Sequence, residues 1–223
     1  MTPLPVTVLV VAKAPVAGLA KTRLAAAVGP AAAADIAAAA LLDTLDAVAA
    51  APVAARVVAM AGDLDKARAA DEIRRRLRAF TVLPQRGKGF ADRLANAHID
   101  AARAAGPMAV LQIGMDTPQI TAALLTRCAE KLLEAPAVLG MACDGGWWVL
   151  GVRSAQTADV LRGVPMSRAD TGALTFAALA DKGIDVTLVD ELRDVDTVDD
   201  VAVVRGAGAA DSRFARVTRA VGV

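Results

Sequence analysis

The sequence predicts an α/β protein whose mostly parallel central sheet is covered by helices on both faces. Short apolar runs alternate with longer segments of helical periodicity along most of the chain. This alternation is typical of strand–helix–strand units. The length of 223 residues suits one such domain, and no internal repeat or long linker divides it. We therefore expect one domain over residues 1–205 and a C-terminal tail over 206–223.

Seven short apolar runs are predicted to be strands. They are residues 6–12, 56–61, 80–83, 108–114, 137–141, 147–152 and 185–189. Five longer segments are predicted to be helices, at residues 31–50, 64–78, 89–105, 120–133 and 171–182. The first of these helices places Leu41, Leu45 and Val48 on one apolar stripe.

The composition limits the classes of partner. Hydrophobic residues make up 56% of the chain but aromatic residues only 3%, so the core is expected to be aliphatic. The 25 basic and 24 acidic residues leave a net charge of +1. The chain therefore lacks the excess of basic residues that is typical of proteins that bind nucleic acid or an anionic membrane surface. We therefore expect neither as a partner.

The sequence also predicts a cytoplasmic protein. Its first residues lack a basic start, and Lys13 interrupts the apolar run too early for a signal peptide. The alanine-rich stretch 25–61 is broken by charged residues and a proline, which argues against a membrane span. Cys128 and Cys143 form neither a disulfide framework nor a metal-ligand spacing, and both are expected to be small buried side chains.

Residues 114–118 place a carboxylate directly after a predicted core strand. The carboxyl ends of such strands are where open α/β sheets bind ligands, so Asp116 is a candidate metal ligand. Pro118 stiffens the turn and keeps Thr117 out of the helical region. The alternative is that Asp116 only caps the helix that follows.

The loop after the first predicted strand combines Gly18 with three cations, Lys13, Lys21 and Arg23. Backbone N–H groups and cations in such a loop can bind phosphate. The loop lacks the glycines of a P-loop and of a dinucleotide-binding Rossmann motif. A solvated basic turn is the alternative.

Four blocks of the chain resemble a bacterial family of GT-A-type transferases of unknown function. The family is also labelled radical-SAM/selenodomain-associated transferase type 1 or arsenosugar-biosynthesis glycosyltransferase-like. Its distant relatives include 2-phospho-lactate guanylyltransferase and the molybdenum-cofactor nucleotidyltransferases. The blocks are Lys-Ala-Pro at 13–15 with Lys-Thr-Arg-Leu at 21–24, and residues 114–118, 144–151 and 194–200. The resemblance implies a three-layer GT-A fold, the fold of nucleotide-diphospho-sugar transferases, with a mostly parallel central sheet.

The resemblance also implies a divalent metal, Mg²⁺ or Mn²⁺, held by Asp116 and Asp196. Asp194, two residues earlier, would share a strand face with Asp196. The alternative for this block is a helix N-terminus that Asp196 or Thr197 caps. The residues implied on the nucleotide side are Lys13, Gly18, Lys21, Arg23 and Arg93.

Asp144 begins an Asp-Gly-Gly turn before a predicted strand. It is a candidate to orient the acceptor or to act as a general base, and the alternative is an ordinary hairpin turn. Because neighbouring strand residues face opposite sides, one of Trp147 and Trp148 is expected in the core, and the other is a candidate to stack on a sugar or base.

The chain departs from the family pattern at several positions. Cys143 stands where glutamate is frequent, and Trp147–Trp148 where the family commonly has two tyrosines. These changes fall on the wall of the acceptor pocket that the resemblance implies, so the acceptor stays open. Met115 and Val198 are further departures, and neither removes a predicted metal ligand.

Three functions follow from these observations. The first is transfer from a nucleotide-diphospho-sugar to a small-molecule acceptor. The second is nucleotidyl transfer from an NTP, in which Lys21 and Arg23 face the β- and γ-phosphates. The third is a nucleotide-binding module without turnover, against which Asp116, Asp144 and Asp196 together argue. His98 has no acidic or cysteine partner at ligand spacing and is expected to be a surface or hydrogen-bonded helix residue.

Overall fold

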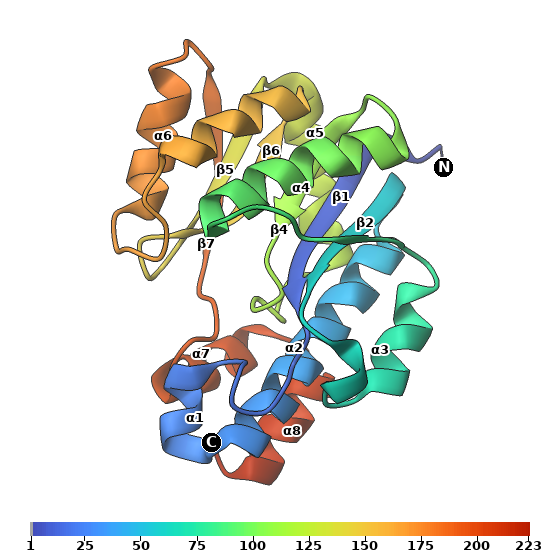
Figure 1. Cartoon of the computed structure of the whole chain (residues 1–223), viewed down its shortest axis with the longest axis vertical. Helices are drawn as coiled ribbons and strands as arrows, with labels where there is room; N and C mark the ends of the chain where they lie inside the picture. The colour runs from blue at the N-terminus through green and yellow to red at the C-terminus, as the bar shows by residue number, and fades with distance from the viewer. Residues whose placement is uncertain (1) are drawn as a thin grey trace.

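Seven strands form one sheet in the computed structural model of the chain, which describes residues 2–223 (Figure 1). The strands are β1 (Leu4–Lys13), β2 (Val53–Ala61), β3 (Thr81–Pro84), β4 (Ala109–Ile113), β5 (Ala137–Ala142), β6 (Trp147–Val152) and β7 (Val186–Leu192). The α-helices are α1 (Thr22–Val28), α2 (Pro30–Ala50), α3 (Ala70–Leu77), α4 (Phe90–Ala105), α5 (Ala122–Glu134), α6 (Thr171–Ala180), α7 (Val198–Ala207) and α8 (Arg213–Val221). Two 3₁₀ helices, η1 (Leu64–Lys66) and η2 (Ala155–Gly163), complete the described elements.

The strand order is β3-β2-β1-β4-β6-β5-β7, and every pairing is parallel except those of β6. The predicted mostly parallel sheet is therefore confirmed. From β1 the chain runs to β2 and β3 on one side and returns to β4 on the other. A reversal of this kind opens a crevice at the carboxyl ends of β1 and β4, where α/β proteins bind ligands.

Two apolar cores cover the two faces of the sheet. Val8 and Val10 of β1 pack on one side with α2, α3 and α5, and Leu9 and Val11 pack on the other with α4 and η2. Since successive strand residues point to opposite faces, a strand in this position is expected to be mostly apolar. The sequence of β1 is apolar from Val8 to Ala12 and also buries Thr7.

A third core lies beyond the carboxyl edge of the sheet. It joins Leu24 of α1, Ile36 of α2, Val201 of α7 and Phe214 of α8 with Val195. Figure 1 shows α1, α7 and α8 grouped below the sheet around one end of α2. We call α1, α7 and α8, packed on α2, the helical base.

Residues 206–223, the expected tail, contain the end of α7 and the whole of α8. Phe214 is 2% exposed, and α8 packs along α2. The carboxylate of Asp43 on α2 accepts the backbone N–H groups of Arg213 and Phe214, at 3.2 and 2.8 Å. These contacts cap α8 and continue the folded structure past residue 205.

Two expectations about single residues are wrong. Cys143 is exposed, because it lies in the turn between β5 and β6. His98 is a fully buried residue of α4, and neither ring nitrogen has a hydrogen-bond partner among the described residues. Burial lowers the pKa of His98 to about 3.

No helix within residues 2–223 is both long and apolar enough to cross a membrane. The 21-residue α2 carries three aspartates.

Candidate functional site

Four carboxylates come from the carboxyl ends of three strands. Asp116 follows β4, Asp144 follows β5, and Asp194 and Asp196 follow β7. These strands run in the same direction, so their ends meet at one edge of the sheet. The backbone N–H of Val195 donates to the backbone oxygen of Asp116 at 2.9 Å and joins two of these segments directly.

Asp194 has the most perturbed carboxyl of the group. Burial raises its pKa, and the carboxylates of Asp144 and Asp116 add to the effect, to about 6. Lys21 partly offsets this rise. The sequence indicated Asp194 only as a neighbour of Asp196. The one local signal for its burial was the apolar Val195 beside it, which is 1% exposed.

Two cations from the start of α1 reach this acidic edge. The ammonium of Lys21 lies 2.6 Å from Asp116 Oδ2, and the guanidinium of Arg23 lies 2.6 Å from Asp196 Oδ2. The Lys21 side chain is 12% exposed and that of Arg23 is 73% exposed. Burial opposes the charge on Lys21, but Asp116, Asp196 and Asp194 together raise the pKa of its ammonium. The structure thus brings four of the predicted site residues into two ion pairs.

The other two predicted residues of the first loop act within the loop. The ammonium of Lys13 donates to the backbone oxygen of Leu19 at 2.7 Å, and its backbone N–H donates to the sulfur of Met115 at 3.1 Å. Gly18 adopts φ 79°, a left-handed conformation that a glycine adopts without strain. In this structure Lys13 and Gly18 shape the loop, and nucleotide contact by either stays a prediction.

Asp116 and Asp196, the two predicted metal ligands, were each also considered as helix caps, and the structure identifies other residues as the caps. The cap of α5 is Thr121, whose hydroxyl accepts the N–H of Leu124, so Asp116 is not a cap. The cap of α7 is Thr197, which forms a capping box with Asp200. Asp196 precedes this box, and its carboxylate is left to Arg23.

The Asp144 turn is held by a second segment, residues 165–172. Gly146 N–H donates to Asp144 Oδ1 at 2.7 Å, and Gly172 N–H donates to the backbone oxygen of Gly145 at 2.8 Å. A Cβ atom on Gly145 would lie 1.8 Å from the backbone oxygen of Ala169. Only glycine fits such an approach, so the turn and residues 165–172 have a fixed relation. Sequence reasoning did not identify this second segment.

The expected split of the tryptophan pair is confirmed. Trp148 is 3% exposed, and its ring N–H donates to the backbone oxygen of Asp190 at 2.8 Å. Trp147 is partly buried and packs against the core on the α4 side of the sheet.

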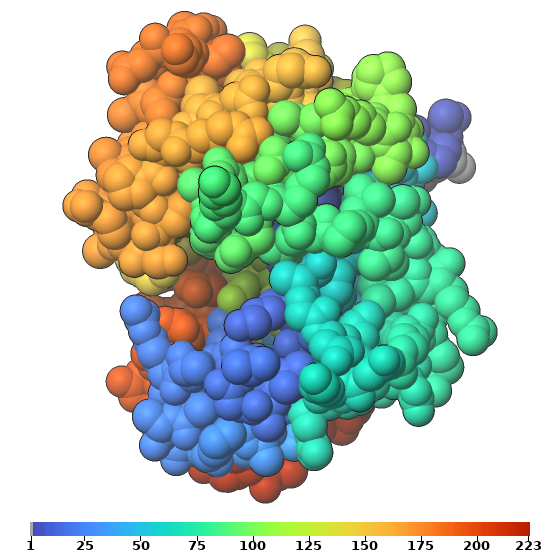
Figure 2. Space-filling model, viewed as in Figure 1, coloured from blue at the N-terminus to red at the C-terminus, as the bar shows by residue number. Residues whose placement is uncertain are grey.

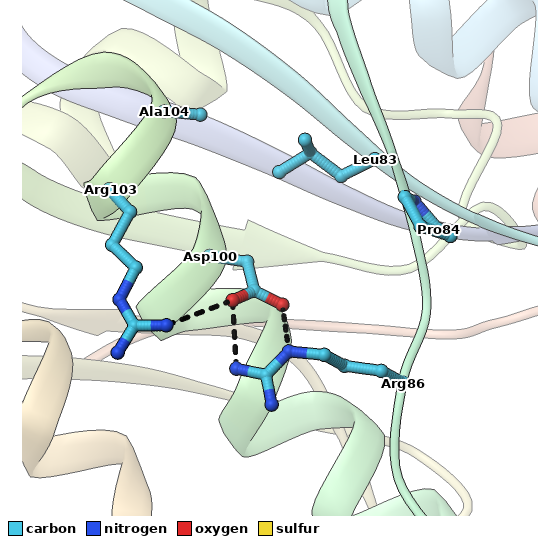
Figure 3. A pocket seen from close by; sticks show the side chains of 6 residues that line it. All are labelled: Leu83, Pro84, Arg86, Asp100, Arg103 and Ala104. Carbon is cyan, nitrogen blue, oxygen red and sulfur yellow. Dashed lines mark hydrogen bonds and ion pairs between the residues drawn. The ribbon is translucent and has the colours of Figure 1, made fainter.

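The segment after β3 is fastened to its neighbours at several points. The amide of Gln85 donates to the backbone oxygens of Ala12 and Ala59, at 2.8 and 2.9 Å. Arg86 forms a two-pronged pair with Asp100 of α4 at 2.6 and 2.8 Å. Figure 3 shows Arg86 and Arg103 directed at this carboxylate in a pocket of about 340 Å³.

Arg93 has a different environment from Lys21 and Arg23. Its guanidinium lies over the ring of Phe90, 5.6 Å from the centroid. Its Nε is buried and has no hydrogen-bond partner among the described residues. A nucleotide contact by Arg93 stays a prediction.

Figure 2 shows a hollow between the N-terminal loop and α1, in blue, and the upper half of the molecule. The orange-yellow segment before α6 and the green segment at the start of α4 border it from above. The N-terminal loop thus borders an open hollow on this face of the molecule.

The donor set fits a hard divalent cation. Within residues 2–223 no three His, Cys, Asp or Glu side chains group to hold a metal ion. Mg²⁺ typically takes one or two carboxylates and completes its shell with water and substrate phosphate oxygens. Carboxylate oxygens suit Mg²⁺ and Mn²⁺, so the chemistry of these side chains is compatible with either ion, and metal binding by Asp116 and Asp196 stays a prediction.

A family model described as "Uncharacterized protein conserved in bacteria (DUF2064)" matches residues 44–168, more than half of the chain. The chain belongs to this family. The matched part of this DUF2064 protein includes Asp116 and Asp144 but neither the first loop nor the block after β7. No curated protein matches the chain.

Solved structures share the fold over nearly the whole chain. A candidate nucleotide-diphospho-sugar transferase from Desulfovibrio desulfuricans G20 has a TM-score of 0.83 and 24% identity, over 97% of this chain and 94% of that one. A cytidylyltransferase from Leptospira borgpetersenii serovar Hardjo-bovis has a TM-score of 0.60 and 12% identity, over 98% and 94%. Rv0371c from Mycobacterium tuberculosis H37Rv, in complex with manganese, has a TM-score of 0.54 and 20% identity, over 90% and 97%. The predicted GT-A, nucleotide-diphospho-sugar transferase-like fold is confirmed.

Proposed function

We propose that this DUF2064 protein is a metal-dependent nucleotidyltransferase, which joins part of an NTP to a small-molecule acceptor and releases pyrophosphate. The observation that carries the proposal is the meeting of two cations of the first loop, Lys21 and Arg23, with carboxylates at the sheet edge. Triphosphate brings clustered negative charge that must be neutralised before a nucleophile can approach. Cations and metal-binding carboxylates at one place serve that need.

Each residue has a separate task in this proposal. Asp116 and Asp194 would hold Mg²⁺ or Mn²⁺. Asp196, the ligand expected from the sequence, would contribute negative charge near the ion while it stays paired with Arg23. The bound ion neutralises phosphate oxygens and stabilises the charge that develops on the leaving pyrophosphate. Lys21 and Arg23 donate to the β- and γ-phosphates, Lys21 as a point charge and Arg23 as a planar fork.

Asp144 serves the acceptor side. An oxygen of the acceptor attacks the α-phosphorus, and the bond from that phosphorus to the pyrophosphate oxygen breaks. Where the acceptor oxygen is a hydroxyl, its proton passes to Asp144 as general base. The fixed Asp-Gly-Gly turn holds this carboxylate at the same edge as Asp116. An acceptor-side carboxylate held in this way also argues against a module without turnover.

Transfer from a nucleotide-diphospho-sugar is the second candidate. It is supported by the high fold similarity to the Desulfovibrio protein, a candidate for that activity. The basic loop favours the first candidate, because a nucleotide sugar has no γ-phosphate for Arg23 to contact. The likeness to a cytidylyltransferase and to a manganese-bound protein supports nucleotide and metal use in either case.

A turnover screen by ³¹P NMR tests the proposal. The protein is incubated with Mg²⁺ or Mn²⁺, a pool of small phosphorylated and hydroxylated acceptors, and either the four NTPs or a set of nucleotide sugars. Pyrophosphate formation is expected and should be lost in Asp116→Asn. The matched control is Asp35→Asn. Asp35 is an exposed carboxylate of α2 that is paired with Arg68. Release of nucleoside diphosphate from a nucleotide sugar would select the second candidate, and a lack of metal-dependent nucleotide binding would contradict both.

A further inference from the structure

Lys21 is paired with Asp116, a carboxylate that would hold the metal ion in the proposed function. Its ammonium is 2.6 Å from Asp116 Oδ2, and Asp194 and Asp196 also act on its charge. We propose that Lys21 is an internal competitor for the divalent cation, so that the metal enters together with a polyphosphate and not before it. This inference rests on the proposed function and adds an order of binding to it.

The first support is the difference between the two ion pairs. The Lys21 side chain is 12% exposed, whereas that of Arg23 is 73% exposed. Water screens an exposed pair strongly, so the Arg23–Asp196 pair is weak and easily exchanged. The Lys21 ammonium is largely removed from water although Asp116 is 36% exposed, and separating the pair would leave the buried ammonium without a partner.

The second support is the way in which the backbone holds Lys21. The residue has φ 48° and ψ 52°, a left-handed conformation that is uncommon for a residue with a side chain. Its backbone oxygen accepts the N–H of Ala25, at 2.8 Å, and the next turn is anchored by the buried Leu24. The start of α1 therefore fixes the backbone of Lys21, from which the side chain reaches Asp116.

A polyphosphate changes this balance. A free divalent ion must displace the ammonium from Asp116 and leave Lys21 unpaired. When polyphosphate oxygens arrive with the ion, Lys21 gains new acceptors and Asp116 gains the metal. Each ligand should therefore raise the affinity for the other, since such coupling is reciprocal.

The test measures binding of MnCl₂ alone, by electron paramagnetic resonance and calorimetry at about pH 8, where the carboxylates are ionised. Lys21→Met should bind Mn²⁺ roughly tenfold more tightly than the unchanged protein, within the usual range of coupling between sites. Lys21→Arg keeps the charge and should keep the weak binding. Arg68→Met, the matched control at an exposed pair outside the site, should change Mn²⁺ affinity by less than about threefold.

With a second probe, Mg²⁺ with inorganic tripolyphosphate, the affinities of the unchanged protein and Lys21→Met should rank in the opposite order. Lys21→Met should bind it roughly tenfold more weakly, because a charge-assisted donor to phosphate is lost. Asp116→Asn in the Lys21→Met background should remove the gain in Mn²⁺ affinity. Thermal unfolding of each variant checks that the fold is retained.

Three results would overturn the inference. One is Mn²⁺ binding by Lys21→Met that is no tighter than that of the unchanged protein, or is absent in both. The second is a gain that survives Asp116→Asn, and the third is an equal gain in Lys21→Arg. None of these measurements depends on turnover, so a failure of the proposed transfer reaction would be seen separately in the ³¹P screen.

Discussion

The sheet and the helical base each supply one half of the candidate site. The sheet supplies Asp116 and Asp144, at the ends of strands that are buried on both faces. The helical base places Lys21 and Arg23 through α1, and its core includes Val195, the residue between the two aspartates that follow β7. The site is therefore a junction, in which a rigid edge meets residues whose positions depend on a much smaller core.

The helical base is held to the rest of the molecule by charge as well as by apolar contact. Arg213 at the start of α8 pairs with Asp43 and Asp46 of α2 and with Glu72 of α3, at 2.7 to 3.1 Å. These hydrogen bonds outweigh the opposing effect of burial and raise the pKa of Arg213. Loss of base contacts should consequently disturb the site before it disturbs the sheet.

Phe214→Ala should distinguish the contribution of the helical base from that of the sheet most clearly. Phe214 is 2% exposed in the base core, so truncation should lower the free energy of unfolding by about 3 kcal/mol. It should also weaken binding of Mg²⁺ with tripolyphosphate, because α1 and the Val195 segment lose their support. Chemical denaturation and calorimetry measure the two effects.

Leu132→Ala is the matched control on the sheet side. Leu132 is fully buried, and its side chain packs against Gly151 of β6. Its loss should also cost about 3 kcal/mol of unfolding free energy while leaving tripolyphosphate affinity unchanged. Equal loss of affinity in both variants would contradict the division into two halves.

Acidification should lower the free energy of unfolding through His98, a buried residue of α4 on the sheet side of the molecule. Burial lowers its pKa to about 3 in the folded chain, against about 6.5 when unfolded, so the unfolded chain binds the proton first. The free energy of unfolding should fall as the pH drops below about 6.5, by about 2 kcal/mol at pH 5. Comparison with His98→Leu isolates this contribution from that of the carboxylates. An equal fall between about pH 7 and 5 in both proteins would show that His98 is not responsible.

Asp43→Ala should loosen α8 with a smaller effect. Its carboxylate accepts two backbone N–H groups at the start of α8 and pairs with Arg213. Loss of a helix cap should lower the free energy of unfolding by about 1.5 kcal/mol. Hydrogen exchange should show faster exchange in α8 than in β1, and uniform exchange changes over the chain would argue against a separate base.

Arg68→Met should have the smallest effect. Arg68 and Asp35 are side chains of the surface that are 51% and 36% exposed, and their pair is screened by water. The free energy of unfolding should change by less than about 0.5 kcal/mol, with no change in tripolyphosphate affinity. A larger loss would contradict the expectation that this exposed pair contributes little to stability.

The two halves also differ in how far the sequence predicts them. All seven strands were found. Strands that are buried on both faces, such as β1 and β4, leave mostly apolar runs, whereas β3 and β7 are largely exposed and were found from shorter runs. The short helices α1, α7 and α8 were not among the predicted helices, and only the start of α7 was considered, as the alternative for residues 194–200. The first N–H groups of α8 are accepted by Asp43, some 170 residues away in sequence. Local periodicity cannot register such a contact.

The same limit applies within the site. Asp116 stood out because it follows a recognisable strand, and Asp144 because it begins an Asp-Gly-Gly turn before one. The Lys21–Asp116 pair spans 95 residues, and the burial of Asp194 depends on the packing of Val195 in the base core. Residues 165–172 carry no motif, and their importance comes from one close approach to Gly145.

The most direct test of the account is calorimetry of NTP binding with and without Mg²⁺, in the unchanged protein and in Asp116→Ala. Asp35→Ala serves as the control for removal of an exposed carboxylate. We predict that the unchanged protein and the control bind NTP much more tightly with Mg²⁺, and that Asp116→Ala loses this dependence. Binding by Asp116→Ala with its Mg²⁺ dependence intact would contradict the assignment of Asp116 and, with it, the proposed site.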